Sequence, residues 1–378
     1  MRVLVTMGTR PEALKLAPLI NLLEKAAPDV ELVLVSTAQH RELLDPVLNL
    51  FDLRPDYDLG VMRPGQSLAQ LHARLLTGLN DVLEGEKPDR VIVQGDTTTA
   101  MAAAQAAFYQ GIPVAHVEAG LRSHDPLSPF PEEANRRAIS LYADLHFAPT
   151  VGASKNLIDE GIPSSKIRVT GNSIVDALET IRPRLLTRNV RQELSLPQDG
   201  PLLLVTAHRR ENHGDGLRDI AKALEELATP QDQIQTPALA LILHPNPAVQ
   251  GCFRSRFEEH SRIRLLEPMD YPTFLGLLSQ ATVVLSDSGG VQEEAPSLKV
   301  PLLVLRDSTE RPEGIEAGVA RLVGTDPLTI VRETNRLLRD PAARQSMLAS
   351  DSPYGDGRAS ERMLQAICES RALELSVV

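Results

Sequence analysis

The chain has 378 residues, of which 42% are hydrophobic and 24% charged, so it can fill the cores of two domains and is not a disordered chain. Its 39 Lys and Arg residues against 50 Asp and Glu residues give a net charge of −11. That balance argues against binding to nucleic acid or to an anionic membrane, because both need a basic surface.

The sequence contains no motif typical of a metal site and no segment typical of a membrane span or a signal peptide. Cys252 and Cys368 stand in no metal or redox spacing, and no apolar run approaches the ~18 residues of a membrane span. The first residues run directly into a predicted strand rather than into a signal peptide. We therefore expect a cytoplasmic α/β protein without a bound metal.

In the first half of the chain, short apolar and β-branched runs end in Gly-rich or polar turns and are followed by helix-like stretches. The predicted strands of this half are Val3–Thr6, Glu31–Ser36, Arg90–Val93, Val114–Val117, Leu145–Ala148 and Ile167–Thr170. Strands that alternate with helices and are apolar on both faces predict a parallel sheet with right-handed crossovers.

The same pattern starts again after a charged, mostly helical break at Asn172–Pro201. The predicted strands of the second half are Leu202–Thr206, Ala240–Leu243, Ile263–Leu265, Val283–Ser286 and Pro301–Leu305. The segment Pro353–Gly357 is typical of a flexible joint, and a last helix is predicted over Ala359–Leu373. We therefore predict two Rossmann-like domains with parallel sheets and a cleft between them, where ligands bind beyond the carboxyl ends of the strands.

The strongest local pattern of the second half is Val283–Ala295, in which a strand leads through a Ser-Gly-Gly turn into a helix. Free backbone N–H groups and the positive helix end would face a phosphate there, and Ser288 adds a hydroxyl. Glu294, one turn into the helix, could accept hydrogen bonds from a ribose. The pattern is neither GxGxxG nor a Walker loop, which disfavours NAD and ATP. An ordinary capped helix start is the alternative.

The first half supplies candidate charges at its own strand ends. Arg10 and Lys15 belong to the first strand–helix turn, where an arginine is a natural diphosphate contact or else a solvated surface charge. Asp96, Glu118 and Glu132 stand at strand ends or in loops. Clustered acids in a cleft move apart in pKa, so that one serves as acid and another as base, whereas isolated acids are usually caps.

Two histidines follow successive strands of the second half. His208 precedes two arginines in Ala207–Asn212, and His244 follows the next strand. The charged loop Leu305–Gly314 is suited either to clamping a sugar or phosphate or to forming internal salt bridges.

Eight segments, in this order along nearly the whole chain, closely resemble the non-hydrolysing UDP-N-acetylglucosamine 2-epimerases. They are Met7–Lys15, Gln94–Thr99, His116–Ser123, Pro129–Arg136, Ala207–Asn212, Ser286–Glu294, Arg306–Gly314 and Pro353–Gly357. The resemblance implies a GT-B-like homodimer that binds a UDP-sugar. It also implies three parts: residues 1–171 with the catalytic acids, residues 172–356 that bind UDP, and a helix at 357–378 that returns to the first domain.

Residue roles carry over from the same motifs. The resemblance implies that the catalytic residues are Asp96, Glu118, Glu132 and His208. The substrate-binding residues it implies are Arg10, Lys15, Arg136, His244, Phe274, Ser288, Gly289, Gly290, Glu294 and Arg311. Among these, Ser288–Gly290 match the diphosphate loop, Glu294 the ribose ligand, and Phe274, in a loop expected at Glu267–Phe274, the uracil pocket.

The family reaction inverts carbon 2 and interconverts UDP-GlcNAc and UDP-ManNAc without a cofactor. Anti elimination of UDP gives 2-acetamidoglucal, to which UDP adds again, so the site needs a base, an acid and stabilisation of the departing diphosphate. Some relatives are activated by UDP-GlcNAc at a second site. Gln39 and Glu132 match that site, but Glu42 and Gly65 stand where regulated relatives have Gln and Arg, so we expect no such activation.

Three alternatives share the phosphate and ribose half of this pattern. One is a GT-B glycosyltransferase, whose acceptor site would not require three acids and the Pro129–Arg136 loop. The second is a hydrolysing 2-epimerase that releases ManNAc and UDP. The third is a catalytically silent UDP-sugar sensor, which would not need the acids at all.

Overall fold

The computed structural model describes residues 1–26, 28–39, 41–185, 187–230, 235–348 and 352–376. They form two compact units, one of Met1–Thr180 with Tyr354–Val378 and the other of Ile181–Pro353. Within these described ranges, no helix is both long enough and apolar enough to cross a membrane.

The first unit is built around a parallel sheet of seven strands in the order β3-β2-β1-β4-β5-β6-β7. Its strands are β1 (Arg2–Met7), β2 (Glu31–Ser36), β3 (Tyr57–Asp58), β4 (Arg90–Gln94), β5 (Val114–Val117), β6 (Leu145–Ala148) and β7 (Ile167–Val169). Its helices are α1 (Arg10–Lys25), α2 (Arg41–Leu50), α3 (Leu68–Glu86), α4 (Thr98–Tyr109), α5 (Glu132–Tyr142), α6 (Val151–Asp159), η1 (Ser164–Lys166), the start of α7 (Ser173–Leu185) and α16 (Ala359–Ser376).

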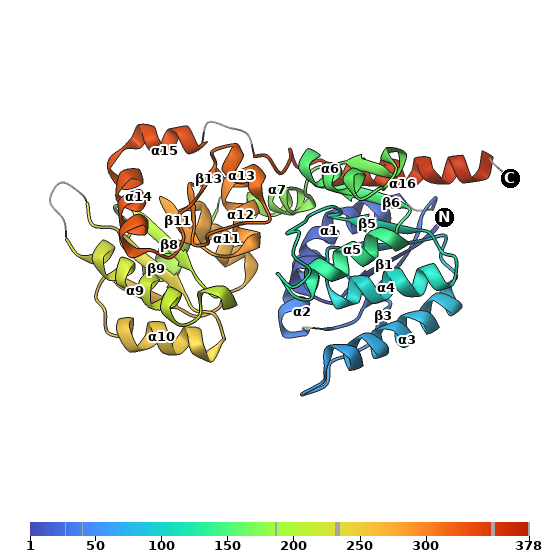
Figure 1. Cartoon of the computed structure of the whole chain (residues 1–378), viewed down its shortest axis with the longest axis horizontal. Helices are drawn as coiled ribbons and strands as arrows, with labels where there is room; N and C mark the ends of the chain where they lie inside the picture. Colours follow the sequence, from blue (N-terminus) through green and yellow to red (C-terminus); the bar gives the residue numbers. More distant parts are fainter. Residues whose placement is uncertain (27, 40, 186, 231–234, 349–351, 377–378) are drawn as a thin grey trace. The chain divides into compact units, whose positions relative to one another are not determined.

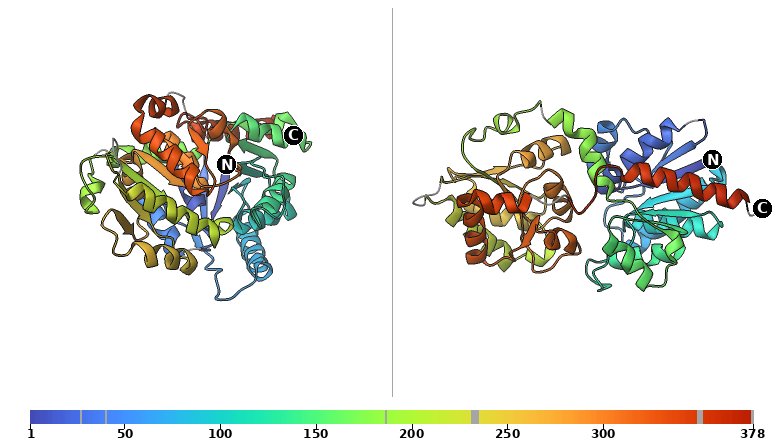
Figure 2. Two further views of the ribbon diagram at one scale, coloured as in Figure 1. Left: turned by 60° about the vertical axis from the view of Figure 1, so that its left-hand side comes forward. Right: turned by 90° about the horizontal axis from the view of Figure 1, so that it is seen from above.

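Helices cover both faces of this sheet. The helices α3, α4 and α5 form one layer, while α1 lies on the other face with α2 and α16 packed against it (Figure 1). Seen from above, α16 runs along this unit beside α1 (Figure 2). Leu4, Val91 and Val93 join the Ala-rich α4 in the core of the first layer. Burial on both faces explains why the strands read as nearly continuous apolar runs.

The second unit repeats the architecture around a parallel sheet of six strands in the order β10-β9-β8-β11-β12-β13. Its strands are β8 (Leu202–Thr206), β9 (Ala238–Ile242), β10 (Ile263–Leu266), β11 (Val283–Ser286), β12 (Leu302–Val304) and β13 (Ala320–Leu322). Its helices after α7 are α8 (Val190–Glu193), η2 (Arg210–Asn212), α9 (Asp215–Ala228), α10 (Pro247–Phe257), α11 (Tyr271–Ser279), α12 (Gly289–Ser297), α13 (Pro312–Glu316), α14 (Pro327–Arg339) and α15 (Pro341–Leu348). The helices α9, α10 and α14 pack on one face over a core of aliphatic and phenylalanine side chains.

Local sequence sets the helix starts at the carboxyl ends of the strands. In α3, α4, α6, α11 and α14 the side chain of the N-cap residue accepts a hydrogen bond from the backbone N–H three residues further along the chain. These N-cap residues are Ser67, Thr97, Thr150, Asp270 and Asp326. Such a cap satisfies one of the free N–H groups of the first turn and contributes about 1 kcal/mol. The first turns of the helices are thereby fixed next to the strand ends.

The division between the units differs from the boundaries expected after residues 171 and 356. The first turns of α7 stay with the first unit because Asp176 accepts the N–H groups of Ala359 and Ser360, at 3.2 and 2.7 Å. The N–H of Asn172 donates to the carbonyl of Tyr354 at 2.7 Å, so the returning chain is tied down before α16 begins. Of the expected last segment, residues 377–378 lie outside the described residues.

Two histidines give the first unit a defined response to acid. His116 on β5 and His146 on β6 are register partners and are both fully buried. Burial disfavours the imidazolium and lowers the pKa of His116 to about 3 and that of His146 to about 4. As pH falls below about 6.5, the unfolded chain therefore binds protons that the folded chain does not.

We expect the free energy of unfolding to fall by about 1.4 kcal/mol per pH unit for each of these histidines between about pH 6 and pH 4. The variant His146→Leu removes one of them, so its stability should depend on pH less steeply than that of the wild type by that amount. Urea unfolding followed by circular dichroism at several pH values measures both slopes. Equal slopes would contradict the assignment.

Candidate functional site

The turn after β1 brings three loops of the first unit together. Gly8 has no room for a side chain, because a Cβ there would overlap the hydroxyl of Thr37 from the loop after β2 and that of Thr99 from the first turn of α4. Thr9 is the N-cap of α1 and forms a capping box with Glu12. Arg10, the first residue of α1, is exposed at this edge of the sheet.

Glu12 is fully buried and lies at the centre of this turn. Its Oε2 accepts the N–H of Gly8 at 3.1 Å and both the N–H and the hydroxyl of Thr9 at 2.8 Å. Its Oε1 accepts the hydroxyl of Thr97 from the loop after β4 at 2.8 Å. Burial raises the pKa of Glu12 to about 7, although all four donors favour the carboxylate.

Glu118, which follows β5, forms an ion pair with Lys15 of α1. Both side chains are only 9% exposed, and Gln94 at the end of β4 and Asn172 before α7 also donate to the Glu118 carboxylate. Glu118 has a φ of 64°, in the left-handed region that costs a residue with a Cβ about 1 kcal/mol or more. Such strain, held in place by three side chains, is characteristic of functional loops.

Asp96, which follows β4, is held by α5. Arg136 donates to its carboxylate through Nε at 3.1 Å and also through Nη2, and Asn135 donates to its carbonyl at 2.9 Å. Arg136 is itself 5% exposed and also contacts the buried Glu133 at 3.2 Å. Arg136, expected to bind substrate, is therefore occupied in orienting Asp96.

Glu132 was expected in a loop, but it is the first residue of α5. Pro131 is the N-cap of that helix, and a proline beside the first turn costs the helix no hydrogen bond. Among the described residues, the Glu132 Oε2 atom is buried and has no hydrogen-bond partner. That oxygen differs from those of Asp96 and Glu118, which face cations.

A second buried carboxylate organises the loops of the second unit. Asp287, directly after β11, accepts the N–H of His208 at 2.9 Å and that of Arg209 at 2.9 Å, both from the loop after β8. Asn212 of η2 donates to the same oxygen at 2.9 Å. The imidazole Nδ1 of His208 lies 3.3 Å from the other carboxylate oxygen.

His208 and His244 are brought together as expected for residues after neighbouring strands. Their rings stack with centroids 5.0 Å apart and an interplanar angle of 10°. The Nδ1 of His244 accepts the N–H of Asn246 at 3.1 Å, which leaves Nε2 of the neutral ring protonated. The stacked pair is thus fixed in orientation by backbone and carboxylate contacts.

Arginines surround the start of α12. A Cβ on Gly289 would lie 2.8 Å from Nη1 of Arg311 and 3.1 Å from Nη2 of Arg209. Arg311 is held by Glu293 at 2.7 Å and by Glu310 at 2.6 Å. Burial alone would raise the pKa of Glu310, but Arg311, Arg306 and Arg209 outweigh it and hold that pKa well below its usual range. The N–H of Ser288 is already bonded to the hydroxyl of Ser286 at 3.0 Å, so the first-turn N–H groups of Gly289 and Gly290, with the two guanidinium groups, make a turn that is suited to binding an anion.

Glu294 and Phe274 lie on the helices α12 and α11. The carboxylate of Glu294 is buried and accepts the hydroxyl of Tyr271 at 2.9 Å. Phe274 is not in a loop ending at residue 274, as the sequence predicted, because α11 already begins at Tyr271. Asp270 caps that helix, and Pro272 fits its first turn.

The expected set lacks three residues that hold the loops within each unit: Glu12 in the first unit, and Tyr271 and Asp287 in the second. Glu12 reads as a capping-box residue and Asp287 as an ordinary helix cap, because their distant partners leave no local pattern. An acid that directly follows a buried strand was the one available signal for Asp287. In the described part of the chain, no cluster of three His, Cys, Asp or Glu side chains is arranged to hold a metal.

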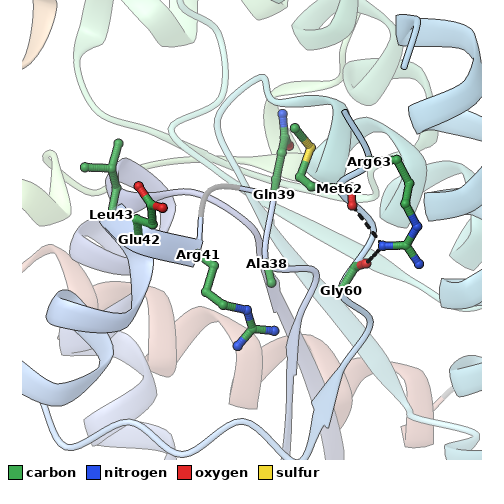
Figure 3. A pocket seen from close by; sticks show the side chains of 8 residues that line it. All are labelled: Ala38, Gln39, Arg41, Glu42, Leu43, Gly60, Met62 and Arg63. Carbon is green, nitrogen blue, oxygen red and sulfur yellow. Dashed lines mark hydrogen bonds between the residues drawn. The ribbon is translucent and has the colours of Figure 1, made fainter. Parts of the chain in front are cut away.

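A cavity of about 540 Å³ lies beside the same edge of the first unit (Figure 3). Gln39 and Glu42 line it together with Met62 and Arg63, whose guanidinium is turned back onto the carbonyls of Gly60 and Met62. Gln39 also accepts the hydroxyl of Thr99 at 3.1 Å. The absence of activation through Glu42 and Gly65 stays a prediction.

Two parallel doubly wound units, with charged side chains gathered after their strand ends, define an α/β protein of GT-B-like fold. An Anabaena protein solved in complex with UDP and glucose shares this fold at 17% identity, with a TM-score of 0.62 and full coverage of both chains.

The chain belongs to the UDP-N-acetylglucosamine 2-epimerase family, whose model matches residues 23–368. The UDP-N-acetylglucosamine 2-epimerase of Salmonella typhimurium is 48% identical over 373 residues, which cover 97% of this chain and 98% of that protein. The crystal structure of UDP-GlcNAc 2-epimerase from Neisseria meningitidis bound to UDP-GlcNAc matches with a TM-score of 0.91 at 44% identity, covering 98% and 100% of the two chains. The family predicted from the sequence motifs is therefore confirmed.

The ion pair of Lys15 and Glu118 should be strongly coupled. We expect Lys15→Met to lower the free energy of unfolding by about 3 kcal/mol, because the Glu118 carboxylate stays buried without its ammonium partner. Adding Glu118→Gln to that variant should restore much of the loss. Chemical unfolding of the two single variants and the double variant measures the coupling, and strictly additive losses would contradict it.

Proposed function

We propose that this protein interconverts UDP-GlcNAc and UDP-ManNAc by inverting carbon 2, without hydrolysis of the sugar–phosphate bond. The observation that carries the proposal is the likeness over 98% of the chain to the Neisseria meningitidis enzyme bound to UDP-GlcNAc. The side chains after the strand ends support it, because they supply acids in one unit and an anion-binding turn in the other.

The second unit is assigned the UDP half of the substrate. The N–H groups of Gly289 and Gly290, the hydroxyl of Ser288 and the guanidinium groups of Arg209 and Arg311 would hold the diphosphate. Glu294, oriented by Tyr271, would accept from the ribose hydroxyls, and Phe274 would line the uracil pocket. His208 and His244 would contribute at the leaving phosphate.

The first unit is assigned the sugar and the proton transfers. A carboxylate removes the proton from carbon 2, the carbon 1–oxygen bond breaks, and UDP leaves with the bonding electron pair to give 2-acetamidoglucal. UDP then adds back at carbon 1 while an acid returns a proton to the other face of carbon 2. No oxidant or reductant is needed, because the substrate and the product have the same oxidation state.

The partners of Asp96, Glu118 and Glu132 indicate which of these three acids removes the proton from carbon 2. Asp96 is paired with Arg136 and Glu118 with Lys15, so both carboxylates already have a cationic partner within the first unit. The Oε2 of Glu132 has no hydrogen-bond partner among the described residues, so this carboxylate is the least committed of the three to other side chains. We therefore assign the first proton transfer to Glu132, with Asp96 and Glu118 orienting the sugar and serving the opposite face.

Product analysis tests the reaction and separates it from its rivals. After incubation with UDP-GlcNAc alone, anion-exchange chromatography should show a mixture of UDP-GlcNAc and UDP-ManNAc and no build-up of free UDP. Free ManNAc with UDP would instead identify a hydrolysing epimerase. Unchanged UDP-GlcNAc, with binding measured by calorimetry, would leave a transferase lacking its acceptor or a sensor.

The anion-binding turn makes a prediction about UDP affinity. In Gly289→Ala the added methyl group would push the Arg311 and Arg209 guanidinium groups from the start of α12, so we expect calorimetry to give a Kd for UDP at least about tenfold higher. Gly251→Ala is the matched control: that glycine lies in α10, and a Cβ there meets nothing within 4 Å. Equal UDP affinity in both variants would remove the diphosphate assignment.

We also propose that the protein is a homodimer, which the family resemblance implies. Phe108 and Leu141, on the packed helices α4 and α5, are 53% and 77% exposed, and the Phe108 ring lies 5.2 Å from that of Tyr142. A second copy of the same face would bury these side chains. In sedimentation, Phe108→Ser with Leu141→Ser should shift the protein to monomer, whereas Leu328→Ser, an exposed leucine on α14, should not. A monomeric wild type would contradict the proposal.

A further inference from the structure

Glu12 connects two turns that lie far apart in the sequence. Three of its donors belong to the turn after β1, namely the N–H of Gly8 and the N–H and hydroxyl of Thr9. The fourth is the hydroxyl of Thr97, which is 85 residues away and follows β4. The two carboxylate oxygens bind different turns: Oε2 accepts the donors of the turn after β1, and Oε1 accepts the donor that follows β4.

The two turns that Glu12 joins occupy a special place in the sheet. The strands β1 and β4 are neighbours, and the chain runs outward from them in opposite directions, through β2 and β3 on one side and β5 to β7 on the other. Open α/β sheets bind their ligands at this reversal. Arg10 follows Thr9 directly, and Asp96 precedes Thr97 directly, so both flank residues that Glu12 holds.

Capping of α1 alone does not account for this arrangement. A capping box needs only the bonds between Thr9 and Glu12, all within the first turn of one helix. Thr97 caps a different helix, α4, by accepting the N–H of Ala100 at 3.0 Å, and its one hydroxyl proton is spent on Glu12. Its side chain therefore couples the start of α4 to the start of α1 through a fully buried carboxylate.

We infer that Glu12 is a positioning residue, which locks the turn after β1 to the turn after β4 and so fixes Arg10 and Asp96 relative to each other. The inference rests on the proposed function, in that the two side chains would meet one substrate. It assigns Glu12 no contact with the substrate and no part in proton transfer. A displacement of about 1 Å at such a site costs up to ~100-fold in rate.

Three variants of helix-cap residues in the first unit distinguish an effect on the position of the site residues from a general loss of stability. Thr97→Val removes both the cap of α4 and the bond to Glu12, whereas Thr97→Ser keeps both. Thr150→Val removes the comparable cap of α6, where Thr150 accepts the N–H of Ala153 at 3.0 Å. We expect Thr97→Val to lose ~10- to 100-fold in kcat with UDP affinity within about twofold of the wild type. Thr97→Ser and Thr150→Val should keep kcat within about threefold, although Thr150→Val should also lower Tm, because it too removes a helix cap.

A double variant and an exchange measurement complete the test. Glu12→Gln with Thr97→Val should lose little more kcat than the worse single variant, because both changes break the same link. Amide hydrogen exchange at Gly8 and Thr9 should accelerate in Thr97→Val and stay unchanged in Thr150→Val, a readout that needs no turnover.

The outcomes separate the inference from the proposed function. Equal kcat and equal exchange in Thr97→Val and Thr150→Val would overturn the positioning role while leaving the epimerase reaction standing. A wild type that binds UDP-GlcNAc but never converts it would remove the proposed function and this inference with it.

Discussion

A fully buried carboxylate joins the loops that follow the two central strands of each sheet. Glu12 accepts donors from the turns after β1 and β4, and Asp287 accepts donors from the loop after β8 while it follows β11 itself. Each lies where the strand order reverses, which is the ligand-binding edge of an open α/β sheet. Because a buried carboxylate without its donors costs several kcal/mol, both pairs of loops are strongly held together. The side chains next to these loops are therefore held in fixed positions as well.

Ion pairs within each unit explain how a chain with a net negative charge can still offer a site suited to an anion. Although the net charge is −11, Arg209, Arg306 and Arg311 converge on Glu310 beside the start of α12. The glutamate keeps the three guanidinium groups in place before any ligand arrives. The donors are thus ordered without a ligand, so the proposed binding of a diphosphate would cost little conformational entropy. Lys15 with Glu118 and Arg136 with Asp96 order the first unit in the same way.

The sequence predicted the strands well and the pairing of charges poorly. Strands buried on both faces read as apolar runs, so Glu31–Ser36 and Leu202–Thr206 were predicted with their observed bounds. The strands β3, with two exposed residues, and β13, with an exposed arginine at its centre, form no such run and were missed. Prolines hid two helix starts, because they read as loop signals and yet fit a first turn, which placed Glu132 and Phe274 in loops. Lys15 and Glu118 are 103 residues apart, and no local spacing indicates that such residues pair.

Proton exchange at carbon 2 is the central step of the proposed reaction, and proton NMR of the enzyme with UDP-GlcNAc in D₂O measures it directly. A base that removes the carbon-2 proton and an acid that returns one from solvent predict UDP-ManNAc with deuterium at carbon 2, formed without added NAD. UDP-ManNAc that retains its original proton there, or a spectrum that never changes although UDP-GlcNAc binds, would contradict it.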